Sequence, residues 1–138
     1  MGRRIILLLA AALLAVVVAG CGLTAAEKRD LRRAEQITKR YAAASGPQAC
    51  SLLSHHALKA LYGNWTTPWR LSRSICLRRA AEFRGEPVTI TRSELLDEKT
   101  IKINALDEDG QFSYQVNLRK GGLGHWRIDL VSQARVTE

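Results

Sequence analysis

The side chains best able to do chemistry in this chain are its cysteine thiols. Cys50 and Cys76 lie 26 residues apart, and an even pair of thiols in an oxidising compartment favours a disulfide. Closing a loop of about 25 residues would stabilise the fold by about 3–4 kcal/mol. Two buried free thiols are the alternative. A metal site is not expected, because no CxxC or HxxxH spacing accompanies the pair.

The third cysteine, Cys21, follows a segment typical of an export signal. Arg3 and Arg4 give a basic start, and an uninterrupted run of 14 apolar residues, 5–18, comes next. A helix that crosses a bilayer needs about 20 apolar residues, so this run is short. It has the length of the apolar core of a secretory signal. Residues 1–20 are therefore predicted to be a signal peptide.

The tetrapeptide that ends this segment, Val18-Ala19-Gly20-Cys21, resembles the lipobox of bacterial lipoproteins. The resemblance implies cleavage before Cys21 and lipid attachment to its thiol. An uncleaved anchor helix and an ordinary secretory signal are the alternatives. Residues 21–23 would form the attachment site and a short tether, with a reach of about 10 Å at full extension. We expect an extracytoplasmic protein anchored to the cell membrane by its lipid.

The chain is strongly basic, with a net charge of +8, and 118 residues with a charge of +6 remain after residue 20. Such a charge favours anionic lipid headgroups, with about 1 kcal/mol for each basic residue near the surface. Nucleic acid is not expected, because the basic residues are not interleaved with stacking aromatics. A solvated helix face is the alternative interpretation of the residues expected to meet the headgroups, which are Lys28, Arg29, Arg32 and Arg33.

Helices are predicted for the first half of the mature chain. Thr24 and Glu27 have the spacing of a capping box, and apolar residues at helical spacing continue to Ala44. A short helix carrying Cys50 should follow, and then a further turn capped by Ser54. A loop over 63–70 and a helix over 72–84 complete this half.

The second half changes to period-two alternation, which predicts strands over 88–91, 101–105, 112–119 and 126–130. Turns at Asp109-Gly110 and Gly121-Gly122 separate the later strands. Helices first and strands afterwards indicate one α+β domain over 24–132, with helices on one face of a four-stranded (or larger) antiparallel meander. Residues 133–138 are predicted to be a C-terminal tail. The inward positions are expected to be Ile101, Ile103, Phe112, Tyr114, Val116, Trp126 and Ile128.

In this order, the features resemble small actinobacterial lipoproteins with a nuclear transport factor two-like domain, a cystatin-like cone. The resemblance covers about residues 35–131 and implies a curved sheet wrapped on helices, with a disulfide between Cys50 and Cys76. Besides the lipobox, the matching segments are Tyr41-Ala42-Ala43-Ala44, Ala49-Cys50-Ser51-Leu52-Leu53, Cys76 followed by Arg78-Arg79-Ala80, and Trp126-Arg127-Ile128-Asp129.

Catalysis is not expected. Enzymes of this superfamily, such as steroid isomerases, place an Asp or an Asp–His pair inside the cone, whereas the inward strand positions here are all apolar or aromatic. His125 and Asp129 should lie on the opposite face, beyond hydrogen-bond reach of a bound substrate.

No metal or cofactor is expected at the other polar clusters. His55 and His56 are interpreted as surface residues at a helix start, because neighbours on a helix point about 100° apart. The segment 107–110 is interpreted as a turn rather than a calcium loop, which would need further ligands.

The candidate ligand or partner contacts are aromatic: Trp65, Trp69, Tyr114 and Trp126. The two tryptophans of the 63–70 loop could cap the cone, enter the membrane interface or grip a partner, and core packing is the alternative.

The expected function is that of a non-catalytic binding or interaction module of the cell envelope, which takes an unknown protein or a small apolar ligand. A carrier or chaperone for an apolar ligand or lipid is the alternative, followed by a cyclase- or isomerase-type enzyme. A pocket large enough for an acyl chain would favour the carrier, and a buried carboxylate or histidine lining the pocket would favour the enzyme.

Overall fold

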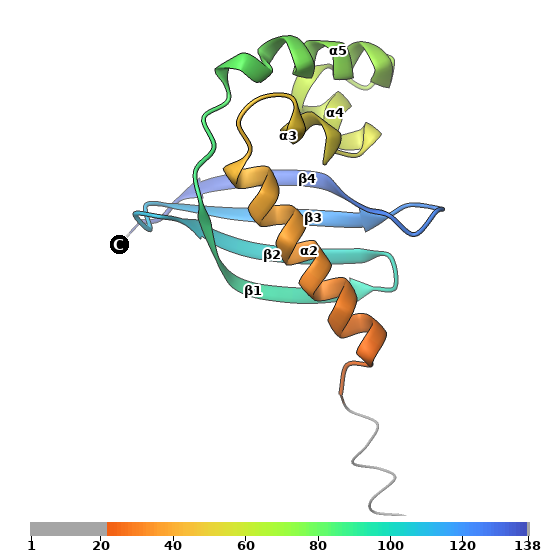
Figure 1. The fold of residues 1–138 in the computed structure, drawn as a ribbon, viewed down its shortest axis with the longest axis vertical. Coiled ribbons are helices and arrows are strands. Elements are labelled where there is room, and N and C mark those ends of the chain that lie inside the picture. Colours follow the sequence, from red (N-terminus) through yellow and green to blue (C-terminus); the bar gives the residue numbers. More distant parts are fainter. Residues whose placement is uncertain (1–21, 138) are drawn as a thin grey trace, which may run out of the picture.

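Helices lie on one face of a four-stranded sheet in the computed structural model, which describes residues 22–137 (Figure 1). The predicted α+β class and the antiparallel meander are confirmed, with the strand order β1-β2-β3-β4. The predicted signal peptide and Cys21 lie outside the described residues.

The helix α2 (Ala25–Ala43) runs diagonally across the sheet (Figure 1). The predicted capping box starts it: Glu27 N–H donates to Thr24 Oγ1 at 3.2 Å, and Thr24 N–H donates to Glu27 Oε2 at 2.6 Å. The helix buries Ala34, Ile37 and Thr38. The helix therefore begins at one end of the sheet and ends near the other (Figure 1).

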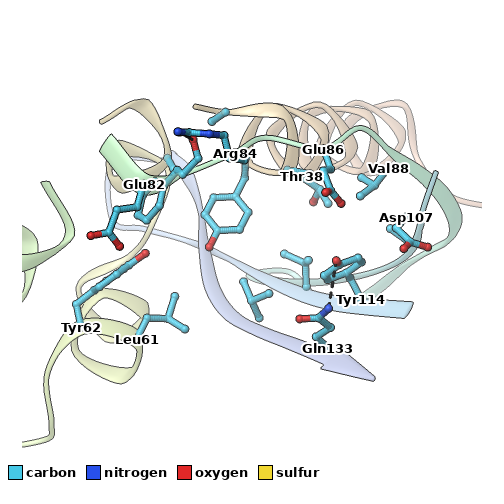
Figure 2. A pocket seen from close by; sticks show the side chains of 18 residues that line it. Thr38, Leu61, Tyr62, Glu82, Arg84, Glu86, Val88, Asp107, Tyr114 and Gln133 are labelled. Atoms are coloured by element: carbon cyan, nitrogen blue, oxygen red, sulfur yellow. Dashed lines mark hydrogen bonds between the residues drawn. The ribbon is translucent and has the colours of Figure 1, made fainter. Parts of the chain in front are cut away.

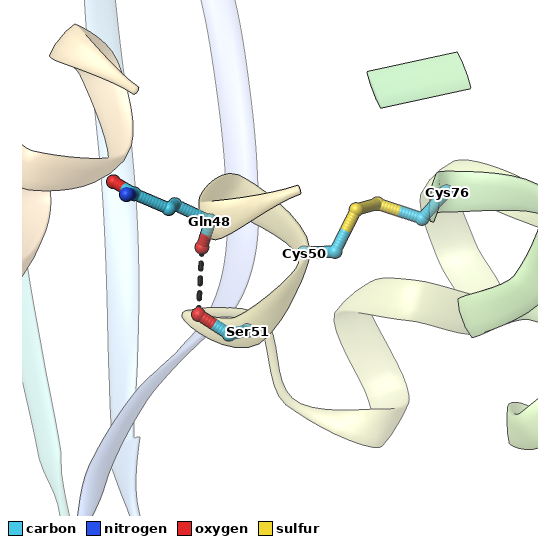
Figure 3. Close-up of a disulfide and its surroundings, with 4 residues drawn as sticks. All are labelled: Gln48, Cys50, Ser51 and Cys76. Atoms are coloured by element: carbon cyan, nitrogen blue, oxygen red, sulfur yellow. Dashed lines mark hydrogen bonds between the residues drawn. A yellow bond between two sulfur atoms is a disulfide. The ribbon is translucent and has the colours of Figure 1, made fainter. Parts of the chain in front are cut away.

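Three short helices and a 3₁₀ turn follow α2: α3 (Gln48–Ser51), α4 (His55–Tyr62), α5 (Trp69–Arg79) and η1 (Ala80–Glu82). A disulfide joins Cys50 of α3 to Cys76 of α5 with 6.0 Å between their Cα atoms (Figure 3). Ser54 caps α4 as predicted, because its Oγ accepts from Ala57 N–H at 3.0 Å. The helix α5 begins three residues before the expected Ser72, since Pro68 at its N-cap already accepts the first backbone bonds.

The strands are β1 (Val88–Asp97), β2 (Thr100–Asp107), β3 (Phe112–Lys120) and β4 (Trp126–Arg135). The expected domain end at Ser132 falls inside β4, whose last residue Arg135 pairs with Phe112. Residues 133–135 therefore belong to the sheet rather than to a tail.

A β-bulge in β4 changes which side chains face the helices. Asn117 pairs with Leu130 and Leu118 pairs with Ile128, so Asp129 is an extra residue on β4. The bulge reverses the alternation beyond it. Leu130, placed inward by strict period two, is 42% exposed, while Val131 faces the helices and packs against the core.

The core between α2 and the sheet is built from the inward aliphatic residues of β2, β3 and β4. Ile101, Ile103, Leu118 and Ile128 are fully buried. The edge of β4 is covered by the segment before α4, since Ser54 N–H donates to Ile128 O at 2.7 Å and Ile128 N–H donates to Leu52 O at 2.9 Å. Pairing of this kind protects an edge strand from other chains.

Candidate functional site

A pocket of about 560 Å³ lies where the core ends, between the last turns of α2, the segment 82–88 and the near end of the sheet (Figure 2). Its volume is within the range of small-molecule sites, which is about 300–1,000 Å³. Apolar and aromatic side chains make most of its wall: Tyr41, Ala42, Ala44, Ala49, Leu61, Tyr62, Phe83, Val88, Ala105, Tyr114, Val116 and Val131.

Three phenol groups from three different elements line this pocket. Burial raises the pKa of Tyr41 to about 12, with a further contribution from Tyr62. Burial also raises the pKa of Tyr62, against the opposing effect of Arg79. The pKa of Tyr114 is raised by burial and then by the carboxylates of Asp107 and Glu86. All three hydroxyls are therefore neutral near pH 7 and can donate hydrogen bonds.

Thr38 of α2 brings a polar atom to the inner wall of the pocket. The residue is 2% exposed, and its Oγ1 has no hydrogen-bond partner among the described residues. An unpaired buried hydroxyl costs about 1–3 kcal/mol. Thr38 is therefore an unsatisfied polar residue in a wall that is otherwise mostly apolar.

Four charged side chains line the pocket, those of Glu82, Glu86, Asp107 and Arg84, and we call this charged part of the lining its mouth; Figure 2 shows Glu82 and Asp107 on opposite sides of the pocket. Asp107 Oδ1 accepts from Phe112 N–H at 3.0 Å and so closes the β2–β3 turn. The Arg84 guanidinium donates to the carbonyls of Ala81 and Phe83 at 3.1 and 3.3 Å.

The acidic part of the mouth is attached to α2 through backbone contact. Glu86 N–H donates to Ala42 O at 2.9 Å. Gly85 makes this approach possible, because a Cβ atom at position 85 would lie 2.1 Å from Ala43 O. The segment 84–86 therefore depends on a residue without a side chain.

These polar residues correct the expectation of a wholly apolar or aromatic sheet lining. Asp107 lies at the end of β2 and Gln133 beyond the bulge in β4, and both line the pocket. The sequence pattern indicates only a turn at Asp107 and only a helix stop near Glu86. For Glu86 the one local signal is the neighbouring Gly85, because a glycine can mark a close approach to another backbone; Asp107 has no such signal.

The four aromatic residues expected to contact a ligand or partner do not meet at one place. Tyr114 lines the pocket, and its hydroxyl accepts from Gln133 Nε2 at 3.3 Å. Trp126 is 5% exposed and belongs to the core. Trp65 is 71% exposed, and Trp69 is half-buried at the start of α5.

Trp65, in the loop before α5, and Trp69, the first residue of α5, pair with the two histidines of α4. The rings of Trp69 and His55 stack with their centroids 3.8 Å apart, and those of Trp65 and His56 are tilted at 5.2 Å. Neither tryptophan lines the pocket, and neither is buried in the core. They form a separate aromatic surface beside α4.

A Ser–His–Asp cluster lies at the bulge, where Asp129 is half-buried rather than on the solvent face as expected. Ser54 Oγ donates to Asp129 Oδ1 at 2.7 Å. His56 Nδ1 lies 2.9 Å from Asp129 O and 3.4 Å from Oδ2. In a nucleophilic triad the histidine contacts the serine, whereas here both contact the aspartate. The cluster joins α4 to β4 and does not activate Ser54.

The basic residues expected to meet anionic headgroups are exposed on α2: Lys28, Arg29, Arg32 and Arg33. No helix within residues 22–137 is both long and apolar enough to cross a bilayer. In the same part of the chain, no three His, Cys, Asp or Glu side chains are grouped as metal ligands.

Fold and site together define a small disulfide-bonded α+β domain with an open, ligand-sized pocket at one end of its sheet. Comparison with known proteins adds nothing to this description, since no protein-family model, no curated protein and no solved structure matches the chain.

Proposed function

We propose that this protein is a membrane-anchored, extracytoplasmic lipoprotein whose nuclear transport factor two-like domain is a non-catalytic binding module for a small, largely apolar ligand. The pocket carries the proposal, because its mostly apolar and aromatic lining also contains the neutral phenol of Tyr41 and Thr38, whose buried hydroxyl is unpartnered among the described residues. An apolar body with one or two polar atoms fits such a lining.

One observation supports the location outside the cytoplasm, and a second concerns the distance between the domain and the membrane. The Cys50–Cys76 disulfide suits an oxidising compartment. The capping box at Thr24 starts the folded domain three residues after Cys21, so a lipid on Cys21 would hold the domain close to the membrane.

The polar groups of the pocket support binding rather than catalysis. Asp107 is engaged by the backbone N–H of Phe112. The described histidines lie outside the pocket lining, and the three phenols are protonated near neutral pH. Hydrogen-bond donors of this kind orient a ligand without requiring a proton transfer.

A carrier or chaperone for an apolar ligand or lipid is the second candidate. It is favoured by the mostly apolar lining, which includes Leu61 and Val131 and would accept a segment of an acyl chain as readily as a compact ligand. A carrier should exchange its ligand with vesicles, whereas a sensor or scaffold should retain it.

The test of ligand binding is native mass spectrometry of the mature domain, made as a Cys21→Ser variant and recovered from its own envelope compartment. A reproducible adduct of a few hundred daltons is expected. Val131→Phe should remove the adduct by filling the pocket, and Leu130→Phe should retain it, because Leu130 is the neighbouring residue on the exposed face of β4. A bare protein in all three samples would overturn the proposal and favour a protein partner.

The anchor is tested separately on the full chain. Protein extracted from membranes should begin at Cys21 and carry the mass of attached acyl groups. The full-length Cys21→Ser variant should lack that mass. An unmodified N-terminus at another position would contradict the lipoprotein assignment and leave the ligand-binding proposal intact.

A further inference from the structure

We infer that the ligand of the pocket is an organic cation, an apolar chain or ring system that carries an alkylammonium group. This inference rests on the proposed binding function and assigns its chemical class. Three carboxylates and a single guanidinium stand at the mouth of the pocket, in a chain whose net charge is +8. The charged residues of the lining thus sum to a negative charge, opposite in sign to that of the whole protein.

The single guanidinium of the lining is held by its own segment. Arg84 Nη1 donates to the carbonyls of Ala81 and Phe83 at 3.1 and 3.3 Å. Salt bridges between Arg84 and the lining carboxylates are absent from the described residues. Glu82, Glu86 and Asp107 therefore remain accessible to a cation that enters the mouth.

The negative charge of the carboxylates reaches side chains inside the pocket. Asp107 ends β2 and Glu86 lies in the segment before β1, and both contribute to the raised pKa of Tyr114, after the effect of burial. A positive charge beside Tyr114 would lie in the field of both groups. Partial shielding from water makes such an interaction stronger than on an open surface.

The aromatic wall has the composition that binds organic cations. Tyr41, Tyr62, Phe83 and Tyr114 all line the pocket, and the faces of such rings attract ammonium groups, as in the cages that bind quaternary amines. A metal cation does not suit the site, because no group of three metal-ligating side chains occurs in residues 22–137. The combination of rings and carboxylates favours an ammonium group over an inorganic ion.

Thr38 adds a polar residue to this lining, and its buried Oγ1 has no hydrogen-bond partner in the described part of the chain. Thr38 lies one helical turn before Ala42, whose carbonyl accepts from Glu86 N–H. The threonine and the Glu86 carboxylate therefore belong to the same part of the wall. A ligand whose charged group binds there would extend its apolar body along the aromatic side chains of the lining.

The experiment compares three decyl compounds that differ only in the head group: decyltrimethylammonium, decyl maltoside and decanoate. Binding to the soluble Cys21→Ser domain is measured by calorimetry below the micelle concentration of each compound. The ammonium compound should bind about tenfold or more tightly than decanoate. This order would oppose the attraction expected from the overall positive charge, and high salt should reduce it.

Variants without the carboxylates test whether Glu86 and Asp107 cause the preference for the ammonium compound. Glu86→Gln with Asp107→Asn should bring the affinities for the ammonium and the carboxylate close together, and the amide oxygen introduced at position 107 keeps an acceptor for Phe112 N–H. Glu108→Gln is the matched control, because Glu108 follows Asp107 in sequence but does not line the pocket. If the double variant fails to fold, Glu86→Gln alone should lower the preference by a smaller factor.

The outcomes separate the two proposals. Equal affinity for the three compounds, or a preference for decanoate, would overturn the cation assignment while ligand binding stands, provided that Val131→Phe abolishes binding. If no compound binds and native mass spectrometry shows no adduct, the binding function and the cation assignment both fail. An anionic or neutral adduct from the envelope would overturn the cation assignment alone.

Discussion

Ser54 donates a 2.7 Å hydrogen bond to Asp129, a residue 75 positions away in the sequence. Ser54 is also the N-cap of α4, and Asp129 is the bulge residue of β4. One hydroxyl therefore starts a helix and fixes that helix to the sheet edge. The bulge that it secures also turns Val131 and Gln133 toward the pocket.

We predict that Ser54→Ala lowers the free energy of unfolding by about 2–3 kcal/mol, because it removes a helix cap and a hydrogen bond to a carboxylate. Urea denaturation followed by circular dichroism measures the change. Ser74→Ala is the control, at an exposed position of α5, and should change stability by less than about 0.5 kcal/mol. Equal effects of the two substitutions would contradict the assigned role of Ser54.

Removing the disulfide as Cys50→Ala with Cys76→Ala should cost about 3 kcal/mol, since the unfolded chain regains the freedom of the closed loop. The same denaturation experiment measures this loss. A reductant should lower the stability of the wild-type protein to a similar extent and leave the double variant unchanged. Wild-type stability that is insensitive to complete reduction would argue against this contribution.

Because the pKa of the Tyr41 phenol is raised in the folded protein, we predict a loss of stability at alkaline pH. Its pKa in the folded protein is about 12, against 10.0 for the unperturbed group. Between these values the unfolded chain has released the proton and the folded chain has not, so stability falls as pH rises from 10 toward 12. Tyr41→Phe should make the fall shallower in denaturation curves at pH 9, 10 and 11. Parallel pH profiles would show that Tyr41 does not contribute.

Gly85→Ala should destabilise the protein and loosen the acidic mouth of the pocket, because the new Cβ would collide with Ala43 O. We expect a loss above about 2 kcal/mol, and faster exchange of the Glu86 amide hydrogen in hydrogen-exchange measurements. Gly122→Ala is the matched control, since no atom lies within 4 Å of a Cβ built there. If both variants keep wild-type stability, the close approach at Gly85 is not required.

Four basic residues of α2 should determine binding of the soluble domain to anionic vesicles. Their replacement by Gln is expected to reduce partitioning to phosphatidylglycerol-containing vesicles by up to about a thousandfold, at about 1 kcal/mol per charge. The residues replaced in this variant are Lys28, Arg29, Arg32 and Arg33. Vesicle sedimentation measures the partitioning of the variant and of the wild-type domain.

The control for this prediction removes the same number of charges from α5, which lies away from the first turns of α2 (Figure 1). Partitioning should fall much less when the residues replaced are Arg70, Arg73, Arg78 and Arg79. Similar losses in the two variants would show that only the total charge matters.

Local signals are sufficient for much of the fold. The Thr24–Glu27 spacing locates the start of α2, and Ser54 locates the start of α4. Alternation identifies all four strands, although each extends beyond its predicted range, β1 and β4 by the most. Each of these features depends on residues close together in the sequence, so a pattern within a few positions is enough to identify it.

The bulge and the polar mouth of the pocket could not be predicted in this way. A bulge is a mismatch between two paired strands, and the residues 128–131 alone give no sign that Asp129 is the extra one. Glu86 and Asp107 lie at the ends of separate segments, and both line the pocket only because the sheet order and α2 bring those ends together.

The helix α2 sets the distance between the start of the domain and the ligand pocket. Thr24 lies just after the proposed attachment cysteine, and Tyr41 lies in the pocket wall, a separation of about 26 Å at 1.5 Å per residue. If α2 stands upright on the membrane, an anchored domain would hold its ligand site well above the lipid headgroups. A molecule could then not pass directly from the bilayer into the site. It would have to arrive through water, so delivery would depend on its solubility or on a second protein that hands it over.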